Sequence, residues 1–280
     1  LGIFFPTNWL EVIFNPSFLY RLLHMVVAAY LTTAFVVAGV ASYYFLKGVY
    51  KEHAKVMLGM AMIMAVFVAP LQLVLGHSHG ENTMEHQPMK VAAMEGNWET
   101  GGNKPLHLLA HPDEDQEKTH SLLSIPNGAS YVLTMKADGE VPGLKDVPKQ
   151  DRPPVATVFW SFRVMVGIGM LMILTGFMAL VLYSRGKLFE NRWFFRWCVA
   201  MAPSGFIAVL AGWFVTEVGR QPYTVYGVMR TAESISPVAA EQVALTLLGF
   251  IVAYTFIFGA GTYYIFRLFK AGPQTKKEKY

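Results

Sequence analysis

Three side chains lie inside long apolar runs of this 280-residue sequence, and each is of a type that binds metal ions. They are His24, Met165 and Glu217. A polar or ionisable group within an apolar run of membrane length is costly, so it is by default a functional candidate. An imidazole and a thioether from two helices can together bind one haem iron, and the thioether raises its reduction potential. A carboxylate near membrane depth can bind a metal or relay protons.

Each of these side chains also has a structural alternative. His24 can donate a hydrogen bond between helices, and Met165 can simply pack, as methionines commonly do in apolar cores. Glu217 stands three residues before Arg220, which is the spacing of an ion pair on one helix face. Arg163 can balance the negative charge of haem propionates, or it can extend its guanidinium to the membrane surface.

A second pair of candidates, Lys90 and Glu95, lies in the run HQPMKVAAMEGNWET. Their spacing places them on adjoining faces of a short amphipathic helix. A carboxylate can accept a proton, and an ammonium group can orient an oxygen or stabilise negative charge on it. The alternative is a pair of solvated surface ions. The histidines of the same region lack the close spacing of a metal site, and Cys198, the one cysteine, is assigned no role.

Five apolar segments must position these side chains. They span roughly residues 16–46, 54–76, 155–183, 193–217 and 239–269. Each is long enough to cross a hydrocarbon core of ~30 Å as a helix, and only helices satisfy the backbone at such lengths. The chain is 54% hydrophobic and 15% charged, which excludes a disordered chain. The sequence predicts an all-α membrane protein, a bundle of five transmembrane helices with one long polar loop.

The polar loop, residues 77–156, carries seven Lys and Arg against twelve Asp and Glu. It is too long for a passive connection, so we expect short helices and a function. The short loops 47–55 and 184–196 and the C-terminal tail are basic, which predicts a cytoplasmic location for them. The polar loop then lies in the periplasm of a bacterium. The net charge of +4 therefore reflects membrane topology and indicates no nucleic-acid partner.

This reading gives three parts: residues 1–76 with two helices, the periplasmic loop 77–156, and residues 157–280 with three helices and a cytoplasmic tail. The tail contributes these basic residues: Arg267, Lys270, Lys276, Lys277 and Lys279.

Four runs in this order resemble subunit I of the cytochrome bd quinol oxidases. They are NPSFLYRLLHMVVAAYLTTAF at 15–35, QPMKVAAMEGNWET at 87–100, SFRVMV at 161–166 and GWFVTEVGRQPYTVYGVMRTAESISP at 212–237. The polar loop resembles that of the short-loop, cyanide-insensitive-type branch. The family's subunit has nine spans and this chain matches the last five, so we expect a portion of a larger subunit.

The resemblance implies a role for each candidate. His24 and Met165 match the ligands of the low-spin b haem, and Arg163 matches an arginine close to it. Glu217 matches the ligand of the high-spin b haem, in a motif that includes Trp213 and Arg220. Lys90 and Glu95 match residues of the quinol loop.

The resemblance further implies a quinol:O2 oxidoreductase in the bacterial inner membrane. Quinol is oxidised at the periplasmic face, and electrons pass through the two b haems to a haem d or a third b haem that reduces oxygen. The implied partners are a second large membrane subunit and a small single-span subunit. The rival hypotheses are a haem-free, proton-coupled transporter or channel that uses His24 and Glu217 as a relay, and a structural subunit without cofactors.

Overall fold

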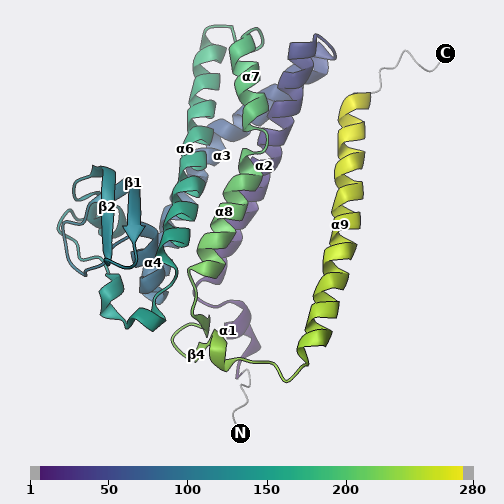
Figure 1. Ribbon diagram of the computed structural model, residues 1–280. Helices are drawn as coiled ribbons and strands as arrows, with labels where there is room; N and C mark the ends of the chain where they lie inside the picture. Colours follow the sequence, from purple (N-terminus) through teal and green to yellow (C-terminus); the bar gives the residue numbers. More distant parts are fainter. Residues whose placement is uncertain (1–6, 274–280) are drawn as a thin grey trace.

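The computed structural model describes residues 7–273 and contains five helical spans long and apolar enough to cross a membrane (Figure 1). The spans are α2 (Phe18–Lys47), α3 (Lys51–His86), α6 (Val155–Ser184), the consecutive helices α7 (Arg192–Met201) and α8 (Ser204–Val218), and α9 (Ala240–Ala271). The predicted helical membrane fold with five spans is confirmed.

Local sequence explains where the spans turn and break. Gly48 ends α2 with a left-handed backbone (φ 75°), and the chain returns at once as α3. The side chain of Asn191 caps α7 by accepting a hydrogen bond from the backbone N–H of Phe194 at 3.0 Å. Pro203 separates α7 from α8, because proline cannot continue the hydrogen-bond ladder of a helix. Pro70, by contrast, lies within an uninterrupted α3.

The two ends of the bundle differ, and we name them by their connections. At the short-loop end, residues 48–50 join α2 to α3 and residues 185–191 join α6 to α7 (Figure 1). At the polar-loop end lie the long segment between α3 and α6, the segment between α8 and α9, and the short helix α1 (Trp9–Ile13).

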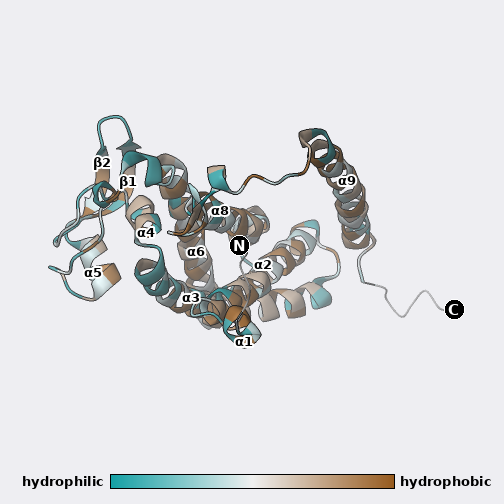
Figure 2. Cartoon of the chain, turned by 90° about the horizontal axis from the view of Figure 1, so that it is seen from below, coloured by the Kyte–Doolittle hydropathy of each residue, from teal (hydrophilic) through white to brown (hydrophobic). Residues whose placement is uncertain are grey.

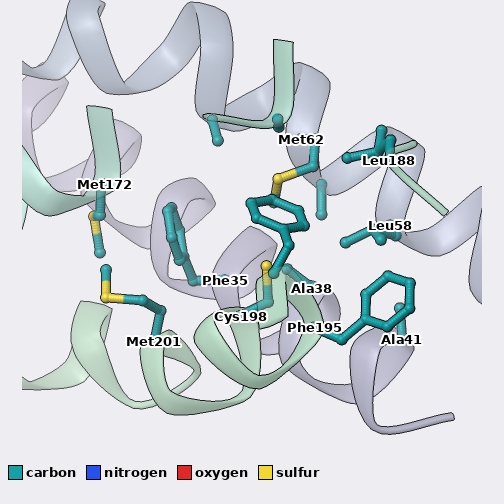
Figure 3. Close-up of a cluster of buried hydrophobic side chains, with 14 of the residues drawn as sticks. Phe35, Ala38, Ala41, Leu58, Met62, Met172, Leu188, Phe195, Cys198 and Met201 are labelled. Atoms are coloured by element: carbon teal, nitrogen blue, oxygen red, sulfur yellow. The ribbon is translucent and has the colours of Figure 1, made fainter. Parts of the chain in front are cut away.

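The main apolar core fills the short-loop half of the bundle, between α2, α3, α6 and α7 (Figure 3). Phe35, Leu58 and Phe194 are fully buried there. Small residues let the helices approach closely, as is common in membranes. A Cβ placed on Gly39 would lie 2.5 Å from the Cβ of Ala202, so α2 contacts the junction of α7 and α8 directly.

The polar segment is more structured than expected. Helix α3 continues to His86, and α4 (Pro88–Glu95) follows at once. Next come the antiparallel strands β1 (Leu106–Asp113) and β2 (Lys118–Ile125), then α5 (Gly128–Thr134) and two short 3-10 turns, Leu144–Asp146 and Lys149–Asp151. The sequence analysis predicted short helices here, and it missed the β-hairpin.

A second, smaller hairpin follows α8. It pairs β3 (Tyr223–Val225) with β4 (Met229–Arg230), and the 3-10 turn Thr231–Glu233 completes it. Arg230 ties this hairpin to the polar segment through Asp151, with Nε–Oδ1 and Nη2–Oδ2 hydrogen bonds of 2.8 and 2.9 Å. The two connections at the polar-loop end are thereby held to each other.

Helix α9 stands apart from the other four spans (Figures 1 and 2). None of the residues in its most apolar stretch is buried. At its C-terminal end, the hydroxyls of Tyr44 and Tyr50 donate to the backbone carbonyls of Phe269 and Ala271 at 2.8 and 3.1 Å. The helix is therefore attached near the short-loop end.

Candidate functional site

A buried ion pair joins the polar segment to α6. The Nη2 atom of Arg163 lies 2.9 Å from Oε2 of Glu95, and the two side chains are only 10% and 5% exposed. The Nε atom of Arg163 donates to the backbone carbonyl of His107 at 2.5 Å. The guanidinium carbon also lies 4.5 Å from the centroid of the Phe159 ring, one turn earlier on α6. Arg163 is therefore fixed by α4, β1 and its own helix.

Helix α4 places Lys90 in a second buried position. Lys90 is 5% exposed, and burial lowers the pKa of its amine to about 8, with further lowering by the positive charges of Arg21 and Arg220. The carboxylate of Glu217 acts in the opposite direction. The hypothesis of solvated surface ions is wrong for Lys90 and Glu95, because both side chains are enclosed.

Lys90 is packed against the end of α8. A Cβ placed on Gly219 would lie 3.0 Å from Cγ and 3.3 Å from Cε of Lys90. The lysine stem thus occupies the space that glycine leaves free. This contact puts Lys90 beside the ion pair of Glu217 and Arg220. Since Lys90, Arg21 and Arg220 are cationic and Glu217 is anionic, the cluster carries an excess of positive charge when all four are ionised.

His24 faces α3. The side-chain nitrogen of Gln72 lies 3.2 Å from Nε2 and 3.3 Å from Nδ1 of His24, and it donates to the His24 backbone carbonyl at 3.2 Å. A Cβ on Gly76 would lie 3.3 Å from the Cε1 atom of His24, and the ring centroid of His79 is 5.5 Å away. A hydrogen bond between helices is therefore present, but Gln72 is its donor and His24, which was expected to donate, accepts it.

Met165 faces α8. A Cβ placed on Gly212 would lie 2.9 Å from the Met165 sulfur, so this side chain packs directly against Gly212. One turn along α6, a Cβ on Gly169 would meet nothing within 4 Å. The structure thus brings His24 against α3 and Met165 against α8, and the contacts of the described residues do not join the two.

The residues of the GWF–E–GRQP run lie at the end of α8. Trp213 is 59% exposed, and the side chain of Glu217, one turn later, is 42% exposed. Glu217 forms the expected ion pair with Arg220, three residues on. The Nε atom of Arg220 is buried and lacks a hydrogen-bond partner among the described residues, so this guanidinium can still donate to an acceptor.

These positions fit haem by donor type. Within residues 7–273, no three His, Cys, Asp or Glu side chains gather as a metal cluster, so the candidate ligands are single donors from separate helices. Imidazole and thioether are common axial ligands of haem iron. Glycines flank both donors, at Gly76 beside His24 and at Gly212 and Gly169 beside Met165. The Nε–H of Arg220 is a donor of the kind that pairs with carboxylates.

Sequence reasoning missed several side chains of the site. Arg21 lies three residues before His24, and Gln72 lies inside the second predicted span. Both are polar groups within apolar runs, so the rule that selected His24 selects them too. Gly219 and the backbone carbonyl of His107 are different, because their roles depend on packing between distant segments that no local pattern reveals.

The second hairpin contributes Tyr226. Its phenol interacts with the backbone N–H of Met89 at the start of α4, and burial raises the pKa of this phenol above its usual range. The ion pair of Arg230 and Asp151 holds the base of the same hairpin. Helix α4 is therefore enclosed by α6, the end of α8 and the segment that follows α8.

Comparison with known proteins supports the resemblance. A family profile described as cytochrome bd terminal oxidase subunit I matches residues 2–273. The cytochrome bd ubiquinol oxidase subunit 1 of Bacillus subtilis (strain 168) is 37% identical over 266 residues, covering 91% of this chain and 57% of that protein. The cytochrome bd-II ubiquinol oxidase subunit 1 of Escherichia coli (strain K12) is 28% identical, covering 98% of this chain and 66% of that protein.

The fold has a counterpart among solved structures. A chain of the bd oxidase from Geobacillus thermodenitrificans matches with a TM-score of 0.83 and 31% identity, covering 95% of this chain and 61% of that one. The chain therefore spans less than two thirds of the length of each of these relatives. Because the profile matches nearly every residue and the fold agrees, this chain belongs to the cytochrome bd terminal oxidase subunit I family.

Proposed function

We propose that this chain forms the quinol-oxidising, haem-binding part of a quinol:O2 oxidoreductase. One observation carries the proposal: Arg163 joins the buried carboxylate of Glu95 to α6, two residues before Met165. A group able to accept a proton from quinol is thereby connected to the helix that carries a candidate haem ligand. The family membership favours this function over a transporter relay or a structural subunit.

His24 and Met165 are proposed to hold a low-spin b haem, and Glu217 a high-spin b haem. Arg163 and Arg220 are proposed to bind propionates, with Trp213 beside the second haem. The oxygen site is proposed to contain a haem d or a third b haem. When bound, these haems supply one-electron redox chemistry and the reduction of oxygen.

Glu95 and Lys90 are proposed to handle the protons of quinol. Quinol oxidation releases two electrons and two protons, so a base must stand beside the hydroxyl that ionises. The Glu95 carboxylate can accept a hydrogen bond from this hydroxyl, and the paired Arg163 keeps the carboxylate oriented. The Lys90 amine, whose pKa is about 8, can donate a hydrogen bond to a quinol oxygen at neutral pH.

The proposed setting is the bacterial inner membrane, with residues 77–156 in the periplasm and the C-terminus in the cytoplasm. The basic loops at the short-loop end support this orientation. Lys276, Lys277 and Lys279 of the tail lie outside the described residues. A second large membrane subunit and a small single-span subunit are the proposed partners, and the lipid bilayer supplies the quinol.

The test of the quinol site is a Glu95→Gln variant of the assembled complex. Removing the charge of a group that accepts a proton should slow quinol oxidation by about 100-fold, within the usual contribution of general base catalysis. Oxygen reduction from an artificial electron donor should keep its rate. The matched control is Glu99→Gln, because Glu99 lies four residues after Glu95 and its side chain is 71% exposed. Equal slowing of both reactions in Glu95→Gln would contradict the proposal.

The test of the low-spin haem is a Met165→Leu variant. Leucine keeps the apolar volume but removes the sulfur, so the reduced-minus-oxidised absorption band of this haem should shift or disappear. Met170→Leu is the control, since Met170 lies on the same helix and is exposed. An unchanged spectrum in Met165→Leu would exclude the thioether as a ligand.

A further inference from the structure

The unit made by the β1–β2 hairpin and α5 exposes a group of large apolar side chains. Leu122 is 86% exposed, and Leu123 and Ile125 beside it on β2 are also exposed. On α5 and at its C-terminal cap, Tyr131 and Met135 are exposed as well. Such a concentration of apolar surface is unusual for a water-facing segment and marks an interaction site.

Two hydrogen bonds fix how this unit lies along α6. Glu114, in the hairpin turn, accepts from the backbone N–H of Ala156 at 3.1 Å, near the start of α6. The carbonyl of His107, near the beginning of β1, accepts a hydrogen bond from Arg163, which lies two turns after Ala156 on α6. The hairpin therefore lies beside α6, with its turn at the helix start and its open end toward the middle of the span (Figure 1).

Helix α5 lies at the same open end. The backbone N–H groups of Ala129 and Ser130 both donate to the carbonyl of Lys104, just before β1, at 3.1 and 3.3 Å. The residue pair that closes the open end, Leu106 and Ile125, is adjacent. On β2, Ile125 pairs with Leu106 and lies beyond His107 toward the middle of α6, whereas Leu122 and Leu123 lie near Leu109, toward the hairpin turn.

The position of the membrane on α6 follows from its length and its aromatic residues. Its 30 residues extend about 45 Å, which exceeds a hydrocarbon core of about 30 Å. Trp160 and Tyr183 are both exposed and lie 23 residues apart, about 35 Å along the helix. Aromatic side chains favour the two membrane interfaces. Arg163 is one turn inside Trp160, so it lies at the edge of the hydrocarbon core.

We propose that the open end of the β1–β2 hairpin and α5 insert into the bilayer interface as a membrane anchor. Leu122, Leu123, Ile125, Tyr131 and Met135 form its apolar surface. Val164, next to Arg163 on α6, is exposed as well. Lys104 and Lys136 flank it in sequence, and their ammonium groups can reach the lipid phosphates while their stems stay apolar.

The anchor has a structural consequence for the site. It holds β1 at a fixed depth, and β1 supplies the His107 carbonyl that binds Arg163. The inference concerns only the position of the hairpin relative to lipid, so it does not depend on the proposed redox function.

The test is spin-label accessibility in the assembled complex, reconstituted in vesicles of phosphatidylethanolamine and phosphatidylglycerol. Labels are attached at Leu122→Cys and Tyr131→Cys, with Gln116→Cys in the exposed hairpin turn as the matched control. Cys198 is fully buried, so it stays unlabelled; accessible cysteines of other subunits are replaced. All three labelled positions are exposed, so the substitutions leave the core intact.

Collision rates are compared for oxygen, which partitions into lipid, and for a water-soluble nickel chelate. The ratio of oxygen to nickel collisions should be at least several-fold higher at Leu122 and Tyr131 than at Gln116. A ratio equal to that at Gln116 would overturn the proposal, because the surface would then face water. Protection of Leu122 and Tyr131 from both reagents would also overturn it, because the surface would then contact protein.

Discussion

At the short-loop end of the bundle, the helices meet through alanine, glycine and large apolar side chains, with Phe35 and Leu58 fully enclosed. At the polar-loop end, they meet around Glu95 and Lys90, which are buried, and Arg163, whose side chain is 10% exposed. Apolar packing needs only complementary shapes, whereas each buried charge needs a partner placed to within hydrogen-bond distance. The short-loop end therefore requires only complementary packing, as in any helix bundle. The polar-loop end requires particular charged residues at particular positions.

The largest difference between the two ends should appear when one member of the buried ion pair is removed. Arg163→Ala leaves Glu95 charged and unpaired, which should reduce the free energy of unfolding by about 3–5 kcal/mol. Thermal unfolding of the purified complex measures the loss. Lys145→Ala is the control, because its ion pairs with Glu99 and Glu117 are more exposed and should contribute under about 1 kcal/mol. Equal effects would mean that the Arg163 pair is no more important than a surface pair.

The corresponding test at the short-loop half is a Gly39→Val substitution. The added side chain would collide with Ala202, so overpacking should cost about 1–3 kcal/mol. Gly59→Val is the control, since a Cβ there meets nothing within 4 Å. Thermal unfolding should separate the two variants, and both should keep the initial quinol oxidation rate below their unfolding temperatures. A lower rate in folded Gly39→Val would show that the two ends are not independent.

The charge on Lys90 should appear in the pH dependence of quinol oxidation. Burial lowers the pKa of its amine to about 8, so the ammonium form predominates below pH 8 and is lost above it. If the ammonium donates to quinol, the rate should fall about fivefold between pH 8 and 9, as the protonated fraction of the amine decreases. A Lys90→Arg variant keeps its charge over this range and should lose the decline. If the rate still declines in Lys90→Arg, the group that titrates is not Lys90.

The smallest effect is expected at the clamp between Arg230 and Asp151. Asp151→Asn removes the charge of the pair but keeps one acceptor, and the Arg230 side chain is 38% exposed. The loss of stability should be small, because solvent screens the charge of Arg230. Hydrogen exchange of the backbone around β3 and β4 should become faster, with no change in α2 or α3. Faster exchange throughout the protein would show that the clamp supports the whole fold.

Much of the fold could be predicted from the sequence, because runs such as 155–183 leave no alternative to a membrane helix. The β1–β2 hairpin could not, since Pro112 and the histidines of its strands are typical of a loop, and its contact with α6 joins segments distant in sequence. The site shows the same division. Lys90 and Glu95 were identified in the sequence, but their partners Gly219 and Arg163 come from segments more than 60 residues away.

The attachment of α9 has an evolutionary consequence. The hydroxyls of Tyr44 and Tyr50 donate to main-chain carbonyls of α9, so these two bonds do not depend on the side chains at Phe269 or Ala271. A helix held in this way can exchange nearly all of its apolar residues without loosening that attachment. Selection on the sequence of α9 therefore acts through the contacts of its remaining surface. The substitutions that α9 tolerates depend on the neighbours at that surface.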